Sequence, residues 1–295
     1  MRITMTTPAP DDVVSLAETL DGWQLDGGPL QLHPGDLGWF SMRGIEATAS
    51  AMRVWLREGR PVAIGLLDGD DLLRLGIAPP ALDDGELAAA IARSVADPSR
   101  GVLPAGVVSV EARGADALAA CLIGAGWGTG DPWVPLHRDL SDPVEATPLR
   151  VEVVEGDLVE PWSEVHFSAF RGGEFTDAVR GRMVHNWQTM AAGPLYDRAR
   201  SLLGRDEAGT PVAAAAVWSA GHGRPGLIEP LAVRRGQQGK GFGRAMTLAC
   251  ASVLRDLGAS SATVCAEASN PAAVATYASA GFTAAPEVPD LRRHA

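Results

Sequence analysis

The segment Leu231-Ala-Val-Arg-Arg-Gly-Gln-Gln-Gly-Lys-Gly-Phe-Gly-Arg244 joins a short apolar run to a glycine-rich loop. Apolar residues at helical spacing continue from it to Leu257, so the segment predicts a strand, a loop and the start of a helix. The four glycines allow several backbone N–H groups to point at one anion, with the positive end of the helix dipole behind them. Lys240 and Arg244 add positive charge. The segment therefore predicts a phosphate site.

Length and composition favour a globular protein of one large or two medium domains. The chain has 295 residues, of which 46% are hydrophobic, enough to bury a sizeable core. Its formal net charge is −11, and it has no basic stripe. A nucleic-acid partner is therefore not expected. The acidic balance is compatible with a cationic substrate, although solubility is its commoner meaning.

Short motifs for metals, disulfides and membranes are missing from the sequence. The three cysteines lie in apolar runs without a CxxC pair, so they are expected to be small buried hydrophobes. The six histidines show no HxH or HExxH spacing, and no metal site is expected. No apolar run reaches the roughly 18 residues of a membrane helix, and the first residues lack a signal-peptide core. A cytoplasmic location is the default expectation.

The order of predicted elements is repeated along the chain. In the first half we expect helices over 13–20, 42–56, 86–96 and 115–123, and strands over 61–67, 72–77, 107–111 and 133–137. In the second half we expect helices over 160–170, 177–190, 241–257 and 271–280, and strands over 149–154, 198–204, 211–218, 227–233 and 262–267. Residues 141–148 are polar and contain prolines, as in a linker. The predicted division is 1–140, linker 141–148 and 149–295.

Spacing suggests that the two halves arose by duplication. A shift of 156 residues places Leu75-Gly-Ile77 on Leu231-Ala-Val233 and Glu111 on Glu267. Both matches keep one offset, so the strand–loop–helix–strand unit has the same length in each half. The alternative is coincidence between two units of common length.

The glycine-rich loop is not repeated. Opposite Gln238-Gly-Lys-Gly-Phe-Gly243 stands Leu82-Asp-Asp-Gly-Glu-Leu87, and Asp84 takes the place of Lys240. Carboxylates at this position would repel a phosphate. Only the second half is expected to hold an anion.

Two motifs resemble those of the GCN5-related N-acetyltransferase (GNAT) superfamily. Gln238-x-x-Gly241-x-Gly243 is similar to the acetyl-CoA pyrophosphate loop of that family. Asn270-x-x-Ala273-x-x-x-Tyr277-x-x-x-Gly281-Phe282 resembles the helix that follows the loop in the family. The resemblance covers about 149–293, whereas the first half is similar in layout only. The tandem arrangement resembles that of the mycothiol synthases.

This resemblance implies the fold and a cofactor. The fold class is α/β (α+β), with two tandem GNAT-like domains, each a mixed, mostly antiparallel sheet flanked by helices. The first domain is expected to lack the acetyl-CoA loop. The implied cofactor is acetyl-CoA, with CoA as product. Its expected contacts are Leu231, Ala232, Val233, Gln238, Gly239, Lys240, Gly241, Phe242, Gly243, Arg244, Asn270 and Ala273.

The resemblance also assigns a general acid. The matching tyrosine of the family protonates the departing CoA thiolate, a role that falls on Tyr277 here, and a phenol holds its proton at neutral pH. The alternative for Tyr277 is core packing. Asn270 precedes Pro271 and would contact the pantetheine or phosphate arm, but its alternative role is a simple helix cap.

Glu229-Pro230 marks a bulge in the strand before the loop, because proline removes a ladder donor. In the family this strand separates from its neighbour and admits the pantetheine arm. Glu229 is the candidate general base, two residues after the usual position but on the same strand face. The alternative role for Glu229 is a structural ion pair with an arginine. Glu267 is a second candidate, for which the match to Glu111 suggests a structural role.

Residues that select the acceptor are expected between the first two helices of the second half. Aromatic and histidine side chains are available there, although such residues are more often core: His166, Phe170, Phe175 and Trp187. The predicted activity is direct transfer of an acetyl group to a primary amine of a small molecule, without membrane or nucleic-acid partners, by a monomer or homodimer. Three alternatives stay open: a non-catalytic acyl-CoA-binding or regulatory protein, a longer acyl chain, and, from the mycothiol synthase resemblance, acetylation of a cysteinyl pseudodisaccharide.

Overall fold

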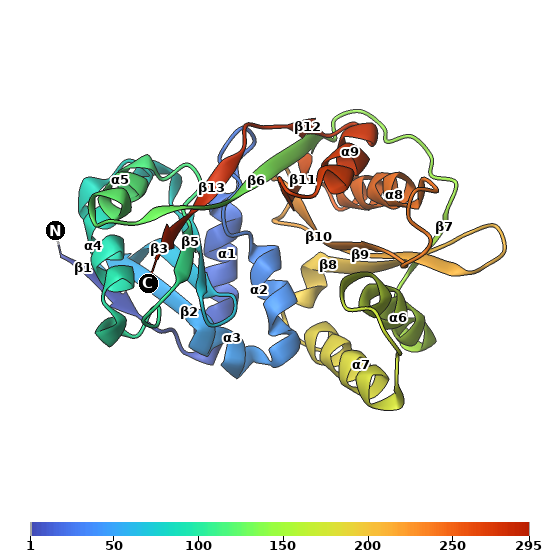
Figure 1. The fold of residues 1–295 in the computed structure, drawn as a ribbon, viewed down its shortest axis with the longest axis horizontal. Helices are drawn as coiled ribbons and strands as arrows, with labels where there is room; N and C mark the ends of the chain where they lie inside the picture. The colour runs from blue at the N-terminus through green and yellow to red at the C-terminus, as the bar shows by residue number, and fades with distance from the viewer. Residues whose placement is uncertain (1, 295) are drawn as a thin grey trace.

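The structure is a computed structural model that describes residues 2–294. Figure 1 shows two α/β halves lying side by side and joined through one sheet. The first half contains helices α1 (Val13–Trp23), α2 (Pro34–Phe40), α3 (Ile45–Ala51), α4 (Gly85–Ala96) and α5 (Asp116–Gly124), and strands β1 (Ile3–Thr6), β2 (Met52–Arg57), β3 (Arg60–Leu67), β4 (Leu72–Ile77), β5 (Val108–Glu111) and β6 (Gly128–Asp139). The second half contains helices α6 (Val159–Phe170), α7 (Asp177–Ala191), α8 (Phe242–Asp256) and α9 (Pro271–Ser279), and strands β7 (Arg150–Val153), β8 (Ala199–Arg205), β9 (Pro211–Trp218), β10 (Gly226–Val233), β11 (Ser261–Glu267), β12 (Thr283–Ala284) and β13 (Val288–Arg293).

The sheet has the same strand order in each half. Its order is β1-β2-β3-β4-β5-β13-β6-β11-β10-β9-β8-β7, with β12 paired to β6. Within residues 2–294 the pairs β4 with β5 and β10 with β11 are parallel, and all other pairs are antiparallel. The predicted fold class, two tandem domains with mixed, mostly antiparallel sheets, is confirmed.

The halves exchange their last strands. Strand β6, from the first half of the chain, pairs with β11 over the whole of Ser261–Glu267. Strand β13, from the end of the chain, pairs with β5, where Leu291 faces Val110. Strands β6 and β13 also pair with each other and so join the two halves. The division of the chain at 141–148 stays a prediction, and in space each half is completed by a strand of the other.

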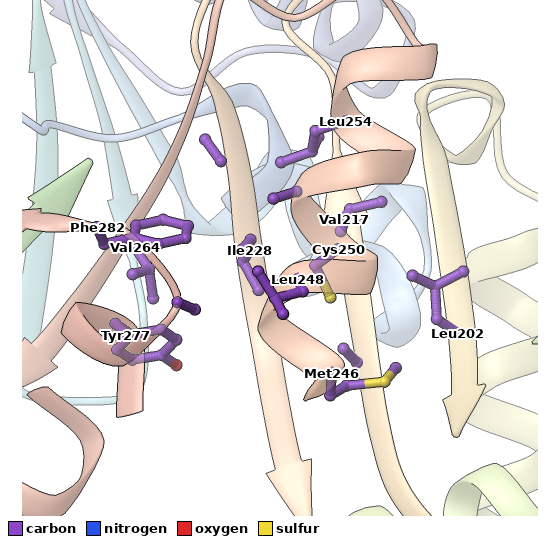
Figure 2. Close-up of a cluster of buried hydrophobic side chains, with 14 of the residues drawn as sticks. Leu202, Val217, Ile228, Met246, Leu248, Cys250, Leu254, Val264, Tyr277 and Phe282 are labelled. Carbon is purple, nitrogen blue, oxygen red and sulfur yellow. The ribbon is translucent and has the colours of Figure 1, made fainter. Parts of the chain in front are cut away.

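Strand β9 shows why both faces of the second sheet are covered by helices. Side chains of a strand alternate between faces. Ala213, Ala215 and Val217 pack in one core with α8, whereas Ala214 and Trp218 pack in another core with α6 and α7. The almost continuous apolar sequence of β9 therefore reflects burial on both faces. Figure 2 shows the α8 side of this core, in which Met246, Leu248 and Leu254 lie against the strands.

The predicted helix over 42–56 is wrong in its second part. A short 3-10 turn, Ser41–Arg43, leads into α3, which ends at Ala51, and Met52–Arg57 is strand β2. Strand β2 pairs with β1 on one side and β3 on the other, and these ladders outweigh the helical spacing of the sequence. Helix α2 and the strands β1, β12 and β13 were also not predicted.

Among residues 2–294, no helix combines the length and the apolar character that a membrane crossing requires.

The strand exchange predicts that a C-terminal residue stabilises the first half. Leu291 of β13 is 5% exposed and belongs to the core of the first half. Leu291→Ala should lower the free energy of unfolding by about 2–5 kcal/mol in urea denaturation. Leu25→Ala is the control, because Leu25 is 51% exposed, and its effect should stay within about 0.5 kcal/mol. Equal effects of the two variants would contradict the assignment of Leu291 to the core.

Candidate functional site

The candidate site lies where β10 separates from β11. The two strands pair only at Gly226–Leu227 with Ala262–Thr263. One residue later, the pairing of β10 with β9 shifts between Ile228 and Leu231. The bulge consists of Glu229 and Pro230, which are joined by a cis peptide bond. Beyond it, Leu231–Val233 pairs with β9 only, so the edge that faces β11 has free backbone groups.

The loop after β10 needs its glycines for two reasons. Gly236, Gly239 and Gly241 have φ of 81°, 77° and 84°, a region that side chains disfavour. The Gln238 side chain holds the turn, because its Oε1 accepts from the Gly236 N–H at 2.7 Å and its Nε2 donates to a β10 carbonyl. Gly243 meets α9 closely, since a Cβ there would lie 2.9 Å from Cγ2 of Thr276.

The N-termini of α8 and α4 differ in whether a side chain caps their first N–H groups. Helix α8 begins after Gly241, and no side chain caps its first amide groups. Helix α4 begins after Asp84, whose Oδ1 accepts from the N–H groups of Glu86 (2.9 Å) and Leu87 (3.0 Å). The same carboxylate pairs with Arg57 at 2.6 Å. A side-chain anion therefore already occupies the first site, whereas the second offers unpaired N–H groups.

The two basic residues of the loop have different surroundings. Lys240 is exposed, and its Nζ donates to the Gln237 side chain at 2.7 Å. Arg244 donates to the Ser279 carbonyl at 2.8 Å and pairs with Glu145. Arg244 thus connects α8 to the end of α9 and to the linker. Lys240 is the cation that can turn toward a ligand without giving up a helix contact.

Helix α9 places Asn270 and Tyr277 beside the separated strands. Asn270 caps the helix, and its Oδ1 accepts from the N–H of Ala273 at 3.1 Å. The Tyr277 ring is buried 6.0 Å from the Phe282 ring. In Figure 2 its hydroxyl lies on the side of the ring that faces β10. Both structural alternatives considered from the sequence, cap and core packing, are thus observed.

The Tyr277 hydroxyl nevertheless differs from an ordinary buried phenol. Burial raises the pKa of Tyr277 well above its usual value, and the charge of Glu229 acts in the same direction. The hydroxyl therefore keeps its proton at neutral pH and can donate it to a stronger base.

Glu229 is held at its backbone but can be reached at its side chain. The indole N–H of Trp218 donates to the Glu229 carbonyl at 2.7 Å. The carboxylate lies 3.6 Å from Nη1 of Arg74, and the side chain is 35% exposed. The arginine pairing considered as its alternative is therefore present, and the carboxylate is still accessible.

The two glutamates matched by the 156-residue shift have different surroundings. Glu111 is buried between Arg74 at 3.3 Å and Arg113 at 3.0 Å. Glu267 is exposed and accepts a hydrogen bond from Ser269.

The predicted acceptor residues do not form one group. His166 stacks on Trp162 at 5.4 Å and contacts the exposed ring of Phe170 at 4.8 Å. Trp39 from α2 of the first half lies 5.6 Å from His166, so this aromatic cluster spans both halves. Burial lowers the pKa of His166 to about 4, and the imidazole is neutral at physiological pH.

The other two predicted residues lie apart from that cluster. Phe175 packs against Phe167 at 5.5 Å. Trp187 is a core residue whose indole donates to Ser201 at 3.1 Å.

The first half contributes charged residues that were not among the predicted site residues. Arg74 of β4 lies 3.0 Å from Asp36, 3.3 Å from Glu111, and 3.6 Å from both Asp68 and Glu229. Burial raises the pKa of Asp36 to about 8, against the opposing effect of Arg74. No local pattern signals this cluster, because its members are distant in sequence and meet only when the halves pack together.

The structure also contains a cavity of about 630 Å³ at another place between the halves. Leu25, Pro29, Arg113, Leu136, Ser261 and Val288 are among its lining residues. Neither Glu229 nor Tyr277 lines it.

Comparison with known proteins agrees with this geometry. A sequence model described as "Acetyltransferase (GNAT) family" matches residues 160–282. A mycothiol acetyltransferase of Propionibacterium freudenreichii subsp. shermanii is 30% identical over 264 residues, which cover 83% of this chain and 78% of the relative. Among solved structures, a tandem GNAT protein from the clavulanic acid biosynthesis pathway has a TM-score of 0.63 at 18% identity, covering 99% of this chain and 98% of its own. A GCN5-related N-acetyltransferase from Sphaerobacter thermophilus has a TM-score of 0.57 at 16% identity, covering 99% and 95%.

The chain therefore belongs to the GNAT family of acetyltransferases, as a tandem-domain member, and is an N-acetyltransferase. Acetyltransferases of this family use acetyl-CoA in general.

The open N-terminus of α8 predicts where a CoA phosphate is held. Gly241→Asp should weaken CoA binding about tenfold or more. The new carboxylate would repel the phosphate and would accept hydrogen bonds from the first N–H groups of α8, as Asp84 does in α4. The measurement is isothermal titration calorimetry with CoA. Gly209→Asp is a matched control, since Gly209 has a φ of 80° and open space around it, in the turn between β8 and β9. Unchanged affinity in the Gly241 variant would contradict the phosphate site.

Proposed function

We propose that the second half binds acetyl-CoA between β10 and β11 and transfers the acetyl group directly to a primary amine of a small molecule. The observation that supports this most is the uncapped N-terminus of α8. Helix α8 follows β10, which has already separated from β11. In the first half, the Asp84 side chain caps the equivalent N-terminus of α4.

The residues around the separated strands fit the cofactor. Free N–H groups of residues 239–244, together with Lys240, would hold the pyrophosphate. The free backbone edge of Leu231, Ala232 and Val233 would pair with the amides of the pantetheine arm. The neighbouring contacts would come from Gln238, Phe242, Gly243, Arg244, Asn270 and Ala273. For Arg244 and Asn270 this contact would be added to the structural bonds they already make.

Acetyl-CoA supplies the acetyl group as a thioester. Glu229 would take the proton of the acceptor ammonium, directly or through a water molecule, because its carboxylate is accessible. A backbone N–H at the Glu229–Leu231 bulge would polarise the thioester carbonyl. Tyr277 would donate its proton to the thiolate that leaves. Both reactants are positioned together, so no covalent enzyme intermediate is needed.

The acceptor would enter from the side of Glu229 that faces the first half. Exposed Phe170 and half-buried Phe175 lie on α6 and in the segment after it. The match to the mycothiol acetyltransferase covers 83% of the chain and thus reaches into both halves. This favours a cysteinyl pseudodisaccharide as the first acceptor to test. The first half would then support the fold and form a wall of the acceptor site.

A panel of amines tests the proposed transfer to a primary amine. The panel contains the cysteinyl pseudodisaccharide, a polyamine, an aminoglycoside and an amino acid amide. Release of free CoA from acetyl-CoA should depend on one class of amine. Binding of acetyl-CoA without CoA release from any amine would contradict the proposed transfer to a primary amine.

Tyr277→Phe tests the general acid. The variant should lower kcat by about 10²-fold or more, while the affinity for acetyl-CoA stays nearly unchanged. The measurements are steady-state CoA release and calorimetry. The chain has two tyrosines, and Tyr196→Phe is the control. The Tyr196 hydroxyl donates to Ser201 at 2.9 Å, so its loss should affect stability rather than kcat. An unaltered kcat in the Tyr277 variant would remove this residue from the chemistry.

A further inference from the structure

Arg74 occupies the position in the first half that faces the candidate base. Strand β4 pairs with β5 only over Leu72–Arg74, so Arg74 is the last paired residue before these strands separate. Glu229 is at the corresponding separation of β10 from β11. The two separation points therefore meet where the halves pack together, and the first half contributes a cation there.

Close packing of α2 fixes this meeting point. Gly35 and Gly38 of α2 lie so near Trp218 that a Cβ would come within 2.4 Å and 2.2 Å of its side chain. The same indole donates to the Glu229 carbonyl. Asp36 lies between these two glycines, so the packing of α2 on β9 brings its carboxylate to the junction.

Besides Glu229, two other carboxylates hold the Arg74 guanidinium in place. Its Nε lies 3.3 Å from Glu111, which Arg113 holds in turn at 3.0 Å. Its Nη1 lies 3.0 Å from Asp36, whose Oδ2 accepts from the His33 N–H at 2.6 Å. The Arg74 side chain is only 14% exposed. A guanidinium fixed in this way presents a defined charge to the Glu229 carboxylate at 3.6 Å.

We propose that Arg74 is a positioning residue, through which the first half orients the Glu229 carboxylate toward the amine and places a positive charge beside it. This inference rests on the proposed role of Glu229 as base. It gives the domain without an anion site a part in the reaction that is separate from cofactor binding.

Other charged groups near Arg74 determine how strongly its positive charge affects the Glu229 carboxylate. Asp36 is buried, and burial raises its pKa against the opposing charge of Arg74. The charge of Arg74 is shared by Asp36, Glu111 and Glu229, and by the half-exposed Asp68 at 3.6 Å. The remaining titratable groups around the cluster come from several elements: His33, Arg113, Cys265, Tyr277 and Asp290.

The first experiment follows the Glu229 carboxyl directly. The protein is labelled with ¹³C at glutamate carboxyl carbons, and the Glu229 signal is assigned by its loss in Glu229→Gln. In Arg74→Met the pH midpoint of this signal should move up by about one unit or more, since a nearby positive charge is lost. Arg57→Met is the control, because Arg57 pairs with Asp84 in the same half and has no contact with Glu229. An unmoved midpoint in folded Arg74→Met protein would overturn the inference.

The second experiment measures the reaction with the amine of the panel that releases CoA fastest. The acid limb of kcat/KM in Arg74→Met should move by the same amount as the carboxyl signal, with CoA affinity unchanged within about twofold. A moved signal with an unmoved limb would overturn the base role of Glu229, and the positioning role with it. CoA binding without any active amine, together with a moved signal, would contradict the proposed enzyme and remove the positioning role.

Arg74→Lys keeps the inference testable if Arg74→Met does not fold. Lysine retains the charge but lacks the planar, fixed set of N–H donors with which an arginine can contact several carboxylates at once. The acid limb should stay within a few tenths of a pH unit of the unsubstituted protein, whereas kcat should fall about tenfold at an unchanged KM for acetyl-CoA. Unchanged kcat in Arg74→Lys would show that the orientation of Glu229 does not depend on the guanidinium, contrary to the inference.

Discussion

The short pairing between β10 and β11 is the constraint on which the site depends. The strands are parallel neighbours for two residues, Gly226–Leu227 on β10, and then separate at the Glu229–Pro230 bulge. Separation leaves a strand edge with unpaired backbone groups, which is costly unless water or a ligand satisfies them. The extended pantetheine arm, with its amides, is suited to such an edge. The glycine loop, the N-terminus of α8 and Tyr277 are all placed by the strands on either side of this separation.

The two halves use the same architecture differently. Each has five strands in the same order and a parallel pair that separates after a few residues. In the first half, the Asp84 side chain caps the N-terminus of α4. In the second half, Gly241 stands at the N-terminus of α8, and no side chain caps it. Exchange of β6 and β13 makes each sheet depend on the other half of the chain. The first half is thus structurally required by the second, and through Arg74 it also reaches the candidate base.

Up to α9, the second half could be predicted from the sequence almost element by element, because its signals are local, whereas β12 and β13 were missed. Glycine spacing in 236–243 and the Asn270-Pro271 helix start depend on backbone preferences that the sequence states directly. The predicted helix over 42–56 overlaps strand β2, because its helical spacing does not show that this segment pairs with β1 and β3. The Arg74 cluster could not be predicted, because its carboxylates come from α2, the β3–β4 turn, β5 and β10. Burial and domain packing bring them together, and neither leaves a periodic pattern.

The central claim is that a duplicated chain keeps one working acetyl-CoA site, at the separation of β10 from β11. A crystal structure of the full chain with CoA tests it most directly. We expect one CoA per chain, with its pyrophosphate on the N–H groups of residues 239–244, its pantetheine arm along Leu231–Val233 and its thiol near the Tyr277 hydroxyl. A pyrophosphate at the N-terminus of α4, or CoA in the cavity beside Leu25 with the 236–244 loop free, would contradict the account.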